Sequence, residues 1–355
     1  MRPQLGKITQ LVIPLSLIVP LTLAGPALAG PPTDPQWQQV DVGTSQGLRG
    51  LDAVDARTAW VGGSGGGVWR TTDAGSSWQD VSPPDTTGLM FRDVEAQDAD
   101  RATVLAIGEG DASRIYRTQD GGQSWDLTFV NDDARAFYNC MDFFPGGLRG
   151  LAVSDPVDGK FRVIGTRDGG RSWSVLPTDG MPEAVNGEYN FAASGTCLVT
   201  AGARDAWIAS GGAASRIFHS SDAGRTWQVS DAPIPATEAG GVFSLAFRNP
   251  DQGVAVGGDF LAPDNGVDAS GLTHDGQTWA GGGDLGGYRS GADWVAGARS
   301  TVIAVGPSGS DISHDQGRTW ETFSDTGFDS VVCTTDGACW ASGSKGRVAR
   351  LSDVG

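Results

Sequence analysis

The chain has 355 residues with 54 glycines and 12 tryptophans, and its 25 Lys and Arg against 42 Asp and Glu give a formal net charge of −17 at pH 7. This acidic balance argues against nucleic acid and anionic membrane surfaces as partners, because both bind through clustered Lys and Arg. Short Val-, Ala- and Trp-containing runs separated by glycines, without long helical periodicity, predict one large all-β domain with no dividing linker.

Residues 1–29 have the pattern of a signal peptide. Arg2 and Lys7 supply a basic start, residues 11–23 are apolar, and residues 27–29 give a small-x-small cleavage pattern. Two prolines interrupt the short apolar run, which favours a cleaved signal over a membrane span. We therefore expect an exported chain that begins near Gly30 and has no transmembrane segment. Loss of the two basic residues takes its net charge from −17 to −19.

A turn motif recurs along the rest of the chain: Ser or Thr, any residue, Asp, any residue, Gly, two residues, then Trp, as in residues 118–125. The Asp can accept backbone N–H bonds in the turn, and Gly takes the positive φ that strains other residues. The Trp would begin the returning strand and bury its ring between repeat units. One copy is a residue shorter, and the six aspartates are Asp73, Asp120, Asp168, Asp222, Asp275 and Asp315. Their separations suit units of four short strands.

This motif resembles the Asp-box, or BNR repeat, of sialidases and several other glycosidases. The resemblance implies a β-propeller in which each box lies on the turn between the third and fourth strands of a blade. It also implies a structural role for the six aspartates, at the blade rim and away from the central funnel.

The two ends of the chain predict a seventh blade. Residues 339–353 align with residues 59–73 and stop just after the box aspartate, so they lack an outer strand. Residues 37–40 resemble the strand that follows each box, such as residues 78–81. We therefore predict a single seven-bladed propeller over residues 30–355, whose last blade combines residues 328–353 with 37–42. An N-terminal strand would close the ring and leave no exposed edge.

The four cysteines suit an oxidising compartment. Cys333 and Cys339 flank a turn-like stretch and could form a hairpin disulfide, while Cys140 and Cys197 fall at similar places in successive blades and could bridge them. Zinc binding is not supported by these spacings. The three histidines lie in or beside boxes, and no phosphate-binding glycine loop is present, so we expect no metal and no cofactor.

Departures from the repeat concentrate in the third to fifth blades, and local rules tend to fail at working sites. Polar and aromatic residues gather there and at the points where the chain enters each innermost strand. We expect them to surround a funnel pocket that binds a protein or carbohydrate ligand. The alternative is that they pair with one another and seal the top of the ring. The candidates are Arg49, Arg92, Arg135, Tyr138, Asp142, Asp155, Asp158, Glu188, Tyr189, Asp259, Tyr288 and Arg289.

Two functions remain open from the sequence. A glycosidase would need two suitably separated carboxylates, and the candidates are Asp142, Asp155, Glu188 and Asp259. The Arg-Ile-Pro segment of sialidases is absent, and xyloglucan-cleaving Asp-box enzymes normally pair two propellers, whereas one is predicted here.

The single exported propeller more closely resembles the photosystem II stability/assembly-factor family and its relatives outside photosynthesis, which often carry the name oxidoreductase. This resemblance implies a non-catalytic scaffold, and nothing in these residues supports redox chemistry. We expect a monomeric binding or assembly module that recognises a protein or small ligand at its funnel face. The glycosidase is the alternative.

Overall fold

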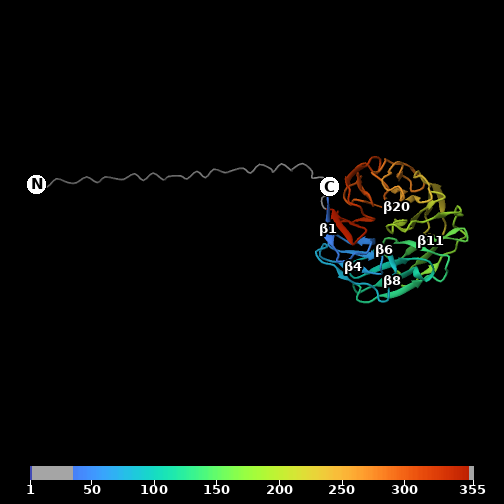
Figure 1. The fold of residues 1–355 in the computed structure, drawn as a ribbon, viewed down its shortest axis with the longest axis horizontal. Coiled ribbons are helices and arrows are strands. Elements are labelled where there is room, and N and C mark those ends of the chain that lie inside the picture. The colour runs from blue at the N-terminus through green and yellow to red at the C-terminus, as the bar shows by residue number, and fades with distance from the viewer. Residues whose placement is uncertain (2–34, 352–355) are drawn as a thin grey trace. The chain divides into compact units, whose positions relative to one another are not determined.

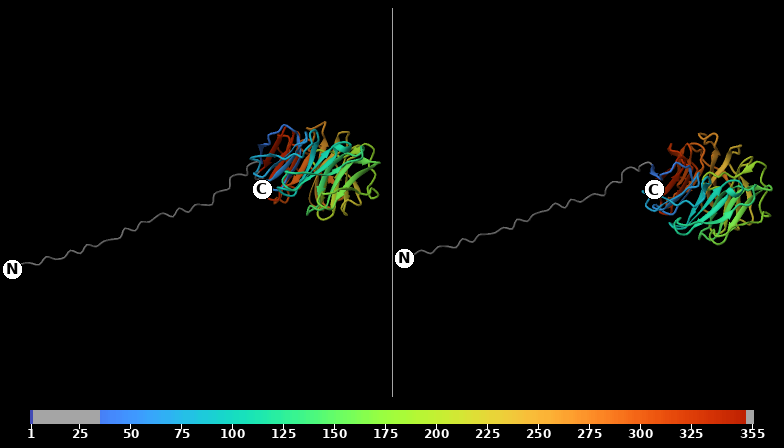
Figure 2. Two further views of the ribbon diagram at one scale, coloured as in Figure 1. Left: turned by 90° about the horizontal axis from the view of Figure 1, so that it is seen from below. Right: turned by 60° about the horizontal axis from the view of Figure 1, so that its bottom comes forward.

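The computed structural model describes residue 1 and residues 35–351, so the predicted signal peptide and the last residues of the predicted seventh blade lie outside the described part. Residues 35–351 form seven antiparallel sheets around a ring, which we call blades 1 to 7 (Figure 1). The ring seen from the side shows strands of neighbouring blades running across its thickness (Figure 2). The prediction of an all-β, seven-bladed propeller is confirmed.

The first three blades follow the chain without interruption. Blade 1 contains β2 (Leu48–Ala53), β3 (Ala59–Gly63), β4 (Val68–Thr71) and β5 (Gln79–Asp80). Blade 2 contains β6 (Met90–Ala96), β7 (Ala102–Ile107), β8 (Arg114–Thr118) and β9 (Asp126–Val130), with the short 3-10 helix η1 (Gly110–Ala112) before β8. Blade 3 contains β10 (Tyr138–Phe143), β11 (Gly150–Val157), β12 (Lys160–Thr166) and β13 (Ser174–Val175).

Blades 4, 6 and 7 also have four strands, and only the sheet of blade 5 has six. Blade 4 contains β15 (Leu198–Ala201), β16 (Asp205–Ala209), β18 (Arg216–Ser220) and β19 (Gln228–Asp231). Blade 5 contains β20 (Gly240–Asn249), β21 (Gln252–Asp259), β22 (Ser270–Thr273) and β23 (Ala280–Gly281), and β14 (Glu188–Tyr189) and β17 (Gly211–Gly212) extend its sheet beside β20. Blade 6 contains β24 (Gly291–Trp294), β25 (Val302–Gly306), β26 (Gly309–Ser313) and β27 (Glu321–Ser324). Blade 7 contains β28 (Ser330–Cys333), β29 (Cys339–Ser342), β30 (Arg347–Leu351) and β1 (Trp37–Asp41).

Blade 7 is completed by the strand from the N-terminal side. Strand β1 pairs antiparallel with β30, from Trp37 opposite Leu351 to Asp41 opposite Arg347. In Figure 1 the blue strand β1 lies beside the red end of the chain. Trp37 Nε1 donates a hydrogen bond of 3.0 Å to Ser310 Oγ in blade 6. The sequence prediction of ring closure is therefore confirmed.

The repeated turns join the third and fourth strands of blades 1 to 6. In the turn after β8, Thr118 Oγ1 accepts the Gly122 N–H at 2.9 Å. Asp120 Oδ1 accepts the Ser124 N–H at 2.9 Å, and Asp120 Oδ2 accepts the Ser124 hydroxyl at 2.6 Å. Gly121 and Gly122 have φ values of 73° and 82°, which only glycine adopts without strain. These bonds explain the spacing of Thr, Asp and Gly in the motif.

The tryptophan of each turn lies where two blades meet. Trp125 of blade 2 contacts Trp60 of blade 1 edge to face, with ring centroids 6.3 Å apart. Trp78 of blade 1 contacts Trp340 of blade 7 in the same way at 6.1 Å. Each edge-to-face pair contributes about 0.5–1.5 kcal/mol beyond the burial of its surface. Hydrophobic cores occupy all seven junctions between consecutive blades.

Both disulfides pair the cysteines that the sequence suggested. Cys140 in β10 bonds Cys197, which precedes β15, and so links blade 3 to blade 4. Cys333 and Cys339 join β28 to β29 within blade 7.

Successive strands of each blade run in opposite directions, so the connections between them lie on two opposite faces of the ring. Each innermost strand is entered from one face, and the connection between the second and third strands of a blade lies there too. We call it the funnel face. The repeated turns and the connections between first and second strands lie on the opposite side, which we call the box face.

Candidate binding site on the funnel face

Five aromatic side chains form a cluster on the funnel face. Phe191 and Phe243 stack with ring centroids 3.8 Å apart and an interplanar angle of 10°. Tyr288 contacts Phe243 at 4.6 Å, and Tyr189 contacts Phe191 at 5.2 Å. Phe260 completes the cluster, 6.3 Å from Phe191. These residues come from the chain entering blades 4, 5 and 6 and from the connection between β21 and β22, so several elements hold the aromatic cluster in place.

The aromatic cluster supports an exposed apolar tip. Phe243 and Tyr288 are buried, whereas Phe260 is 47% exposed and the adjacent Leu261 is 74% exposed. Both exposed residues lie in the insertion between β21 and β22. Contiguous apolar surface rimmed by polar groups is typical of protein recognition sites.

The insertion that carries this tip is held by hydrogen bonds. Asp259 Oδ1 accepts the Leu261 N–H at 2.8 Å, and Asp259 Oδ2 accepts the Thr237 hydroxyl at 2.7 Å. The Pro263 carbonyl accepts the Tyr288 N–H at 3.0 Å. The Asp259 carboxylate therefore fixes the shape of the insertion.

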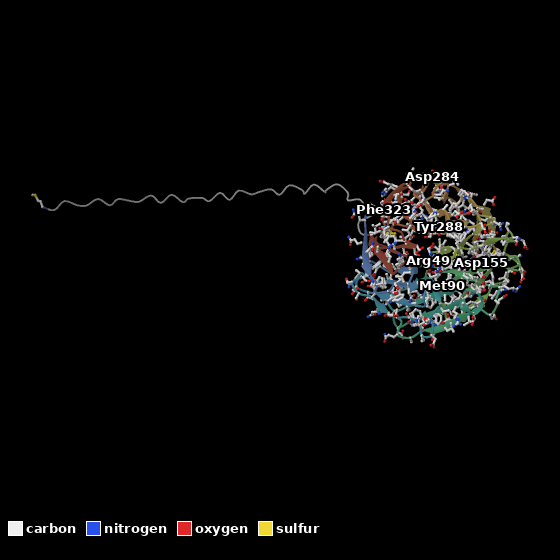
Figure 3. All side chains as sticks on the ribbon, viewed as in Figure 1. Arg49, Met90, Asp155, Asp284, Tyr288 and Phe323 are labelled. Atoms are coloured by element: carbon white, nitrogen blue, oxygen red, sulfur yellow. A yellow bond between two sulfur atoms is a disulfide. The ribbon has the colours of Figure 1, made fainter. Side chains whose placement is uncertain are left out.

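Two arginines lie beside the aromatic cluster. Arg49 forms an ion pair of 3.3 Å with Asp329, and Arg92 donates to the Ala192 carbonyl at 2.8 Å. Burial, together with the positive charge of Arg49, lowers the pKa of Arg92 to about 10. Figure 3 places Arg49 and Tyr288 near the middle of the ring, whereas Asp284 lies toward its outer edge (Figure 3). Positive charge and aromatic surface thus occur together at the funnel mouth.

Four predicted funnel residues form ion pairs, which are buried for Glu188 and Arg289 and exposed for Arg135 and Asp158. The buried Glu188 carboxylate accepts hydrogen bonds from Arg216 Nε at 3.0 Å and from the Ser210 hydroxyl at 2.5 Å. Arg289 is fully buried, and its Nε lies 2.7 Å from Asp311 Oδ2. The exposed Arg135 pairs with Asp158 at 2.8 Å. The alternative from the sequence, pairing among the candidates, describes Arg135 and Asp158, whereas Glu188 and Arg289 pair with Arg216 and Asp311, which were not candidates.

Asp155 belongs to the junction of blades 3 and 4, and Tyr138 to the junction of blades 2 and 3. Asp155 Oδ1 accepts hydrogen bonds from Asn139 Nδ2 at 3.0 Å and from the Asn190 N–H at 2.9 Å. Burial raises the pKa of Asp155 to about 6. Tyr138 is buried, and its ring lies 5.2 Å from that of Phe129.

We expected Asp142 at the funnel mouth, but it lies deeper in the ring. It follows the buried half of β10 and lines a cavity of about 240 Å³ at the centre of the ring, together with Asp52, Asp93, Glu95 and Asp293. The structure corrects the expected position because β10 begins at the funnel face and has almost reached the box face at Asp142. We call Asp52, Asp93, Glu95, Asp142 and Asp293 the channel carboxylates.

Four of the five channel carboxylates tie innermost strands together. Asp93 Oδ2 accepts the Met141 N–H of blade 3 at 2.5 Å, and the other three form equivalent bonds from another position of the strand. Asp52, Asp142 and Asp293 accept backbone N–H groups of the neighbouring blade at 2.6, 2.5 and 2.7 Å, from Ala96, Thr200 and Cys333 respectively. Burial raises the pKa of Asp52 and Asp142 to about 7 and that of Asp293 to about 6. The sequence analysis did not single out Asp52 and Asp293. Asp52, Asp142 and Asp293 occupy the same position of their innermost strands, so an alignment of these strands would have identified them.

The four carboxylates considered for glycoside hydrolysis have separate surroundings. Glu188 is ion-paired, Asp142 lines the central cavity, Asp259 fixes the insertion and Asp155 joins blades 3 and 4. Within residues 35–351, no group of three or more His, Cys, Asp or Glu is arranged to hold a metal ion. The described part also contains no helix long and apolar enough to span a membrane.

Comparison with known proteins identifies the fold. No protein-family model and no curated protein matches this sequence. Among solved structures, YCF48 bound to D1 peptide is similar with a TM-score of 0.61 and 15% identity, covering 92% of this chain and 99% of that one. YCF48 from Cyanidioschyzon merolae gives 0.56 and 15%, covering 89% and 98%. The Neurospora crassa Pan2 WD40 domain gives 0.63 and 11%, covering 90% and 96%. At these identities the likeness establishes the seven-bladed propeller architecture.

Proposed function

We propose that this chain is an exported, non-catalytic binding propeller of the Asp-box type that recognises an apolar segment of another protein at its funnel face. The observation that carries the proposal is the exposed pair Phe260 and Leu261, supported from below by stacked Phe191 and Phe243. Apolar residues that are held in position before binding lose little conformational entropy when they bind. The site spans the chain entering blades 4 to 6, one blade further along than the sequence alone indicated.

Further features support the proposed peptide binding, the Asp-box type and export. A propeller of similar architecture, YCF48, has been solved with a peptide bound. The repeated turn has the Ser/Thr, Asp and Gly hydrogen bonds that an Asp-box requires. The basic and apolar residues of positions 1–29 and the two disulfides both favour export into an oxidising compartment.

Peptide selection tests the proposed surface. Peptides would be selected from a random displayed library on the purified chain, and their affinities for variants measured by fluorescence anisotropy. We expect apolar peptides whose affinity falls at least tenfold, equivalent to about 1.4 kcal/mol, when Phe260→Ser and Leu261→Ser are combined. The control combines Leu127→Ser and Val130→Ser, two exposed apolar residues of β9 in blade 2.

Two results would contradict the proposal. Selected peptides could bind the Phe260→Ser/Leu261→Ser variant as tightly as the unmodified chain, which would place recognition elsewhere. Sustained turnover on a glycan panel, abolished by Asp155→Asn, would show that the propeller is a glycosidase.

A further inference from the structure

A cleft lies on the box face, opposite the proposed peptide site. It has a volume of about 510 Å³ and lies between the outer half of blade 3 and the box-face turns of blade 4. Its apolar lining comes from Phe144, Leu151, Trp173 and Leu176. We call it the box-face cleft.

Four arginines surround this cleft in a chain whose net charge is −17. They are Arg149 and Arg167 of blade 3 and Arg204 and Arg225 of blade 4, and all four are exposed. Arg149 donates to the Ala203 carbonyl at 2.7 Å, and its guanidinium lies 5.4 Å from the Phe144 ring centroid. Among residues 35–351, none of the four forms an ion pair with a carboxylate.

The corresponding arginine of blade 2 has a carboxylate partner, unlike Arg149. Arg101 ends the connection between β6 and β7, and its Nη2 lies 2.6 Å from Asp98 Oδ2 in the same connection. Arg149 ends the equivalent connection of blade 3, which runs Pro145-Gly146-Gly147-Leu148 and contains no acidic residue. Its charge is therefore left without the local partner that Arg101 has in blade 2.

The two carboxylates that line the cleft are already satisfied by their own turns. Asp168 Oδ1 accepts the Ser172 N–H at 3.0 Å and its Oδ2 accepts the Ser172 hydroxyl at 2.6 Å. Asp222 is bonded in the same way by Thr226, at 2.9 and 2.7 Å. Four guanidinium groups thus face two carboxylates whose oxygens are occupied, and the cleft retains an excess of positive charge.

We propose that the box-face cleft binds an acidic polypeptide segment in which carboxylates alternate with aliphatic side chains. The arginines would pair with the carboxylates, and guanidinium–carboxylate pairs can be bidentate. The partly exposed Trp173 and Leu176 would receive the aliphatic side chains, as would Val175, which is 53% exposed beside them. An anionic glycan fits less well, because it has no aliphatic side chains to place against Trp173, Val175 and Leu176.

The test uses a labelled hexapeptide of alternating Glu and Leu, with its Gln–Leu counterpart as the neutral probe. Anisotropy would be measured on the full chain at about 50 and 300 mM salt. We expect the Glu–Leu peptide to bind at least tenfold more tightly than the Gln–Leu peptide at the lower salt concentration. Its affinity should fall at the higher concentration, because salt screens exposed charges.

Matched charge reversals locate the site. Arg167→Glu combined with Arg225→Glu should weaken Glu–Leu binding at least tenfold. Arg299→Glu combined with Arg318→Glu makes the same charge change on exposed residues of blade 6 and should change affinity less than twofold. Arg167→Gln with Arg225→Gln provides a milder pair if the reversal impairs folding. Phe260→Ser with Leu261→Ser should leave Glu–Leu binding unchanged, so this proposal and the funnel-face proposal can fail separately.

Three outcomes would overturn the proposal. One is equal binding of Glu–Leu and Gln–Leu peptides. Another is an equal loss of affinity in the blade 3/4 and blade 6 reversals, which would indicate only a general charge effect. The third is binding of oligogalacturonate without binding of the Glu–Leu peptide, which would assign the cleft to an anionic glycan.

Discussion

Individual aspartates have opposite protonation preferences in two parts of this propeller. In the repeated turns, hydrogen bonds lower the pKa of Asp168 to about 2, and the bond from the Ser172 hydroxyl has the largest effect. In the central cavity, burial raises the pKa of Asp142 to about 7 even though backbone N–H groups of Thr200 and Phe143 bond its oxygens. The turns therefore favour charged aspartate, and the cavity favours the protonated form.

Removing the Asp142 carboxyl group should destabilise the junction of blades 3 and 4. Asp142→Ala leaves the Thr200 and Phe143 N–H groups without an acceptor, which we expect to lower the free energy of unfolding by about 1–3 kcal/mol. Asp142→Asn keeps a side-chain oxygen and should lose less. Urea denaturation measures both. Equal stability of Asp142→Ala and the unmodified chain would contradict the role of Asp142 as a link between strands.

The channel carboxylates should make the protein less stable as pH rises from about 5 to 8. Their folded pKa values, about 7 for Asp52 and Asp142 and about 6 for Asp293, exceed the ordinary value of 3.8. Their contribution to stability is therefore complete below pH 3.8 and is lost as pH rises through 6 to 7. The turn aspartates have lowered pKa values and act oppositely, losing their contribution only as pH falls below about 4.

Thermal unfolding at pH 5 and pH 8 measures this dependence. We expect a higher Tm at pH 5, and a smaller difference when Asp52, Asp142 and Asp293 are all replaced by Asn. A triple variant that loses as much stability between pH 5 and pH 8 as the unmodified chain would locate the effect outside the channel.

At the scale of elements, β1 determines whether the ring closes. It is the only strand taken from the far end of the described chain, and it pairs with β30 over its whole length. Trp37 packs against Phe323 and Phe328 at the junction of blades 6 and 7. It occupies there the position that a turn tryptophan occupies at each of the other junctions.

Replacing Trp37 should therefore weaken the whole ring. Trp37→Ala removes a large, partly buried side chain, and we expect a loss of about 3 kcal/mol, at the low end for core aromatic truncations because the residue is not fully buried. Gln39→Ala, at an exposed position of the same strand, is the control and should change stability little. If urea denaturation finds the two variants equally stable, β1 is an accessory strand and not the closure of the ring.

The two disulfides should contribute unequally. Cys140 and Cys197 close 57 residues between two blades, whereas Cys333 and Cys339 close 6 within one hairpin. Loop-closure entropy gives about 4 kcal/mol for the first and about 2 kcal/mol for the second. Replacing each pair by Ala and comparing Tm should show the larger loss for the pair between blades. The opposite order would indicate that strain or residual structure outweighs loop length.

For the molecule as a whole, local turn chemistry made the fold predictable. The Thr118, Asp120 and Gly122 bonds form within a few residues, so the motif carries its own structure, and its six copies locate six of the seven blades. The partners of Glu188 and Arg289 could not be predicted, because Arg216 and Asp311 lie on other strands and occupy ordinary repeat positions.

The box-face cleft could not be predicted from the sequence either. Arg167 and Arg225 stand at variable positions of two repeated turns, and only the stacking of blades 3 and 4 brings them to one cleft. The insertion could be predicted at residues 258–265, since it interrupts a regular unit, but its aromatic support from the chain entering blades 4 and 6 could not.

Hydrogen–deuterium exchange with and without a selected apolar peptide tests the funnel-face assignment most directly. We predict slower exchange in residues 186–193 and 259–268 when peptide is bound, with the outer strands of blades 1 and 2 unchanged. Protection confined to the box face or to blades 1 and 2, with none in the insertion between β21 and β22, would contradict this assignment.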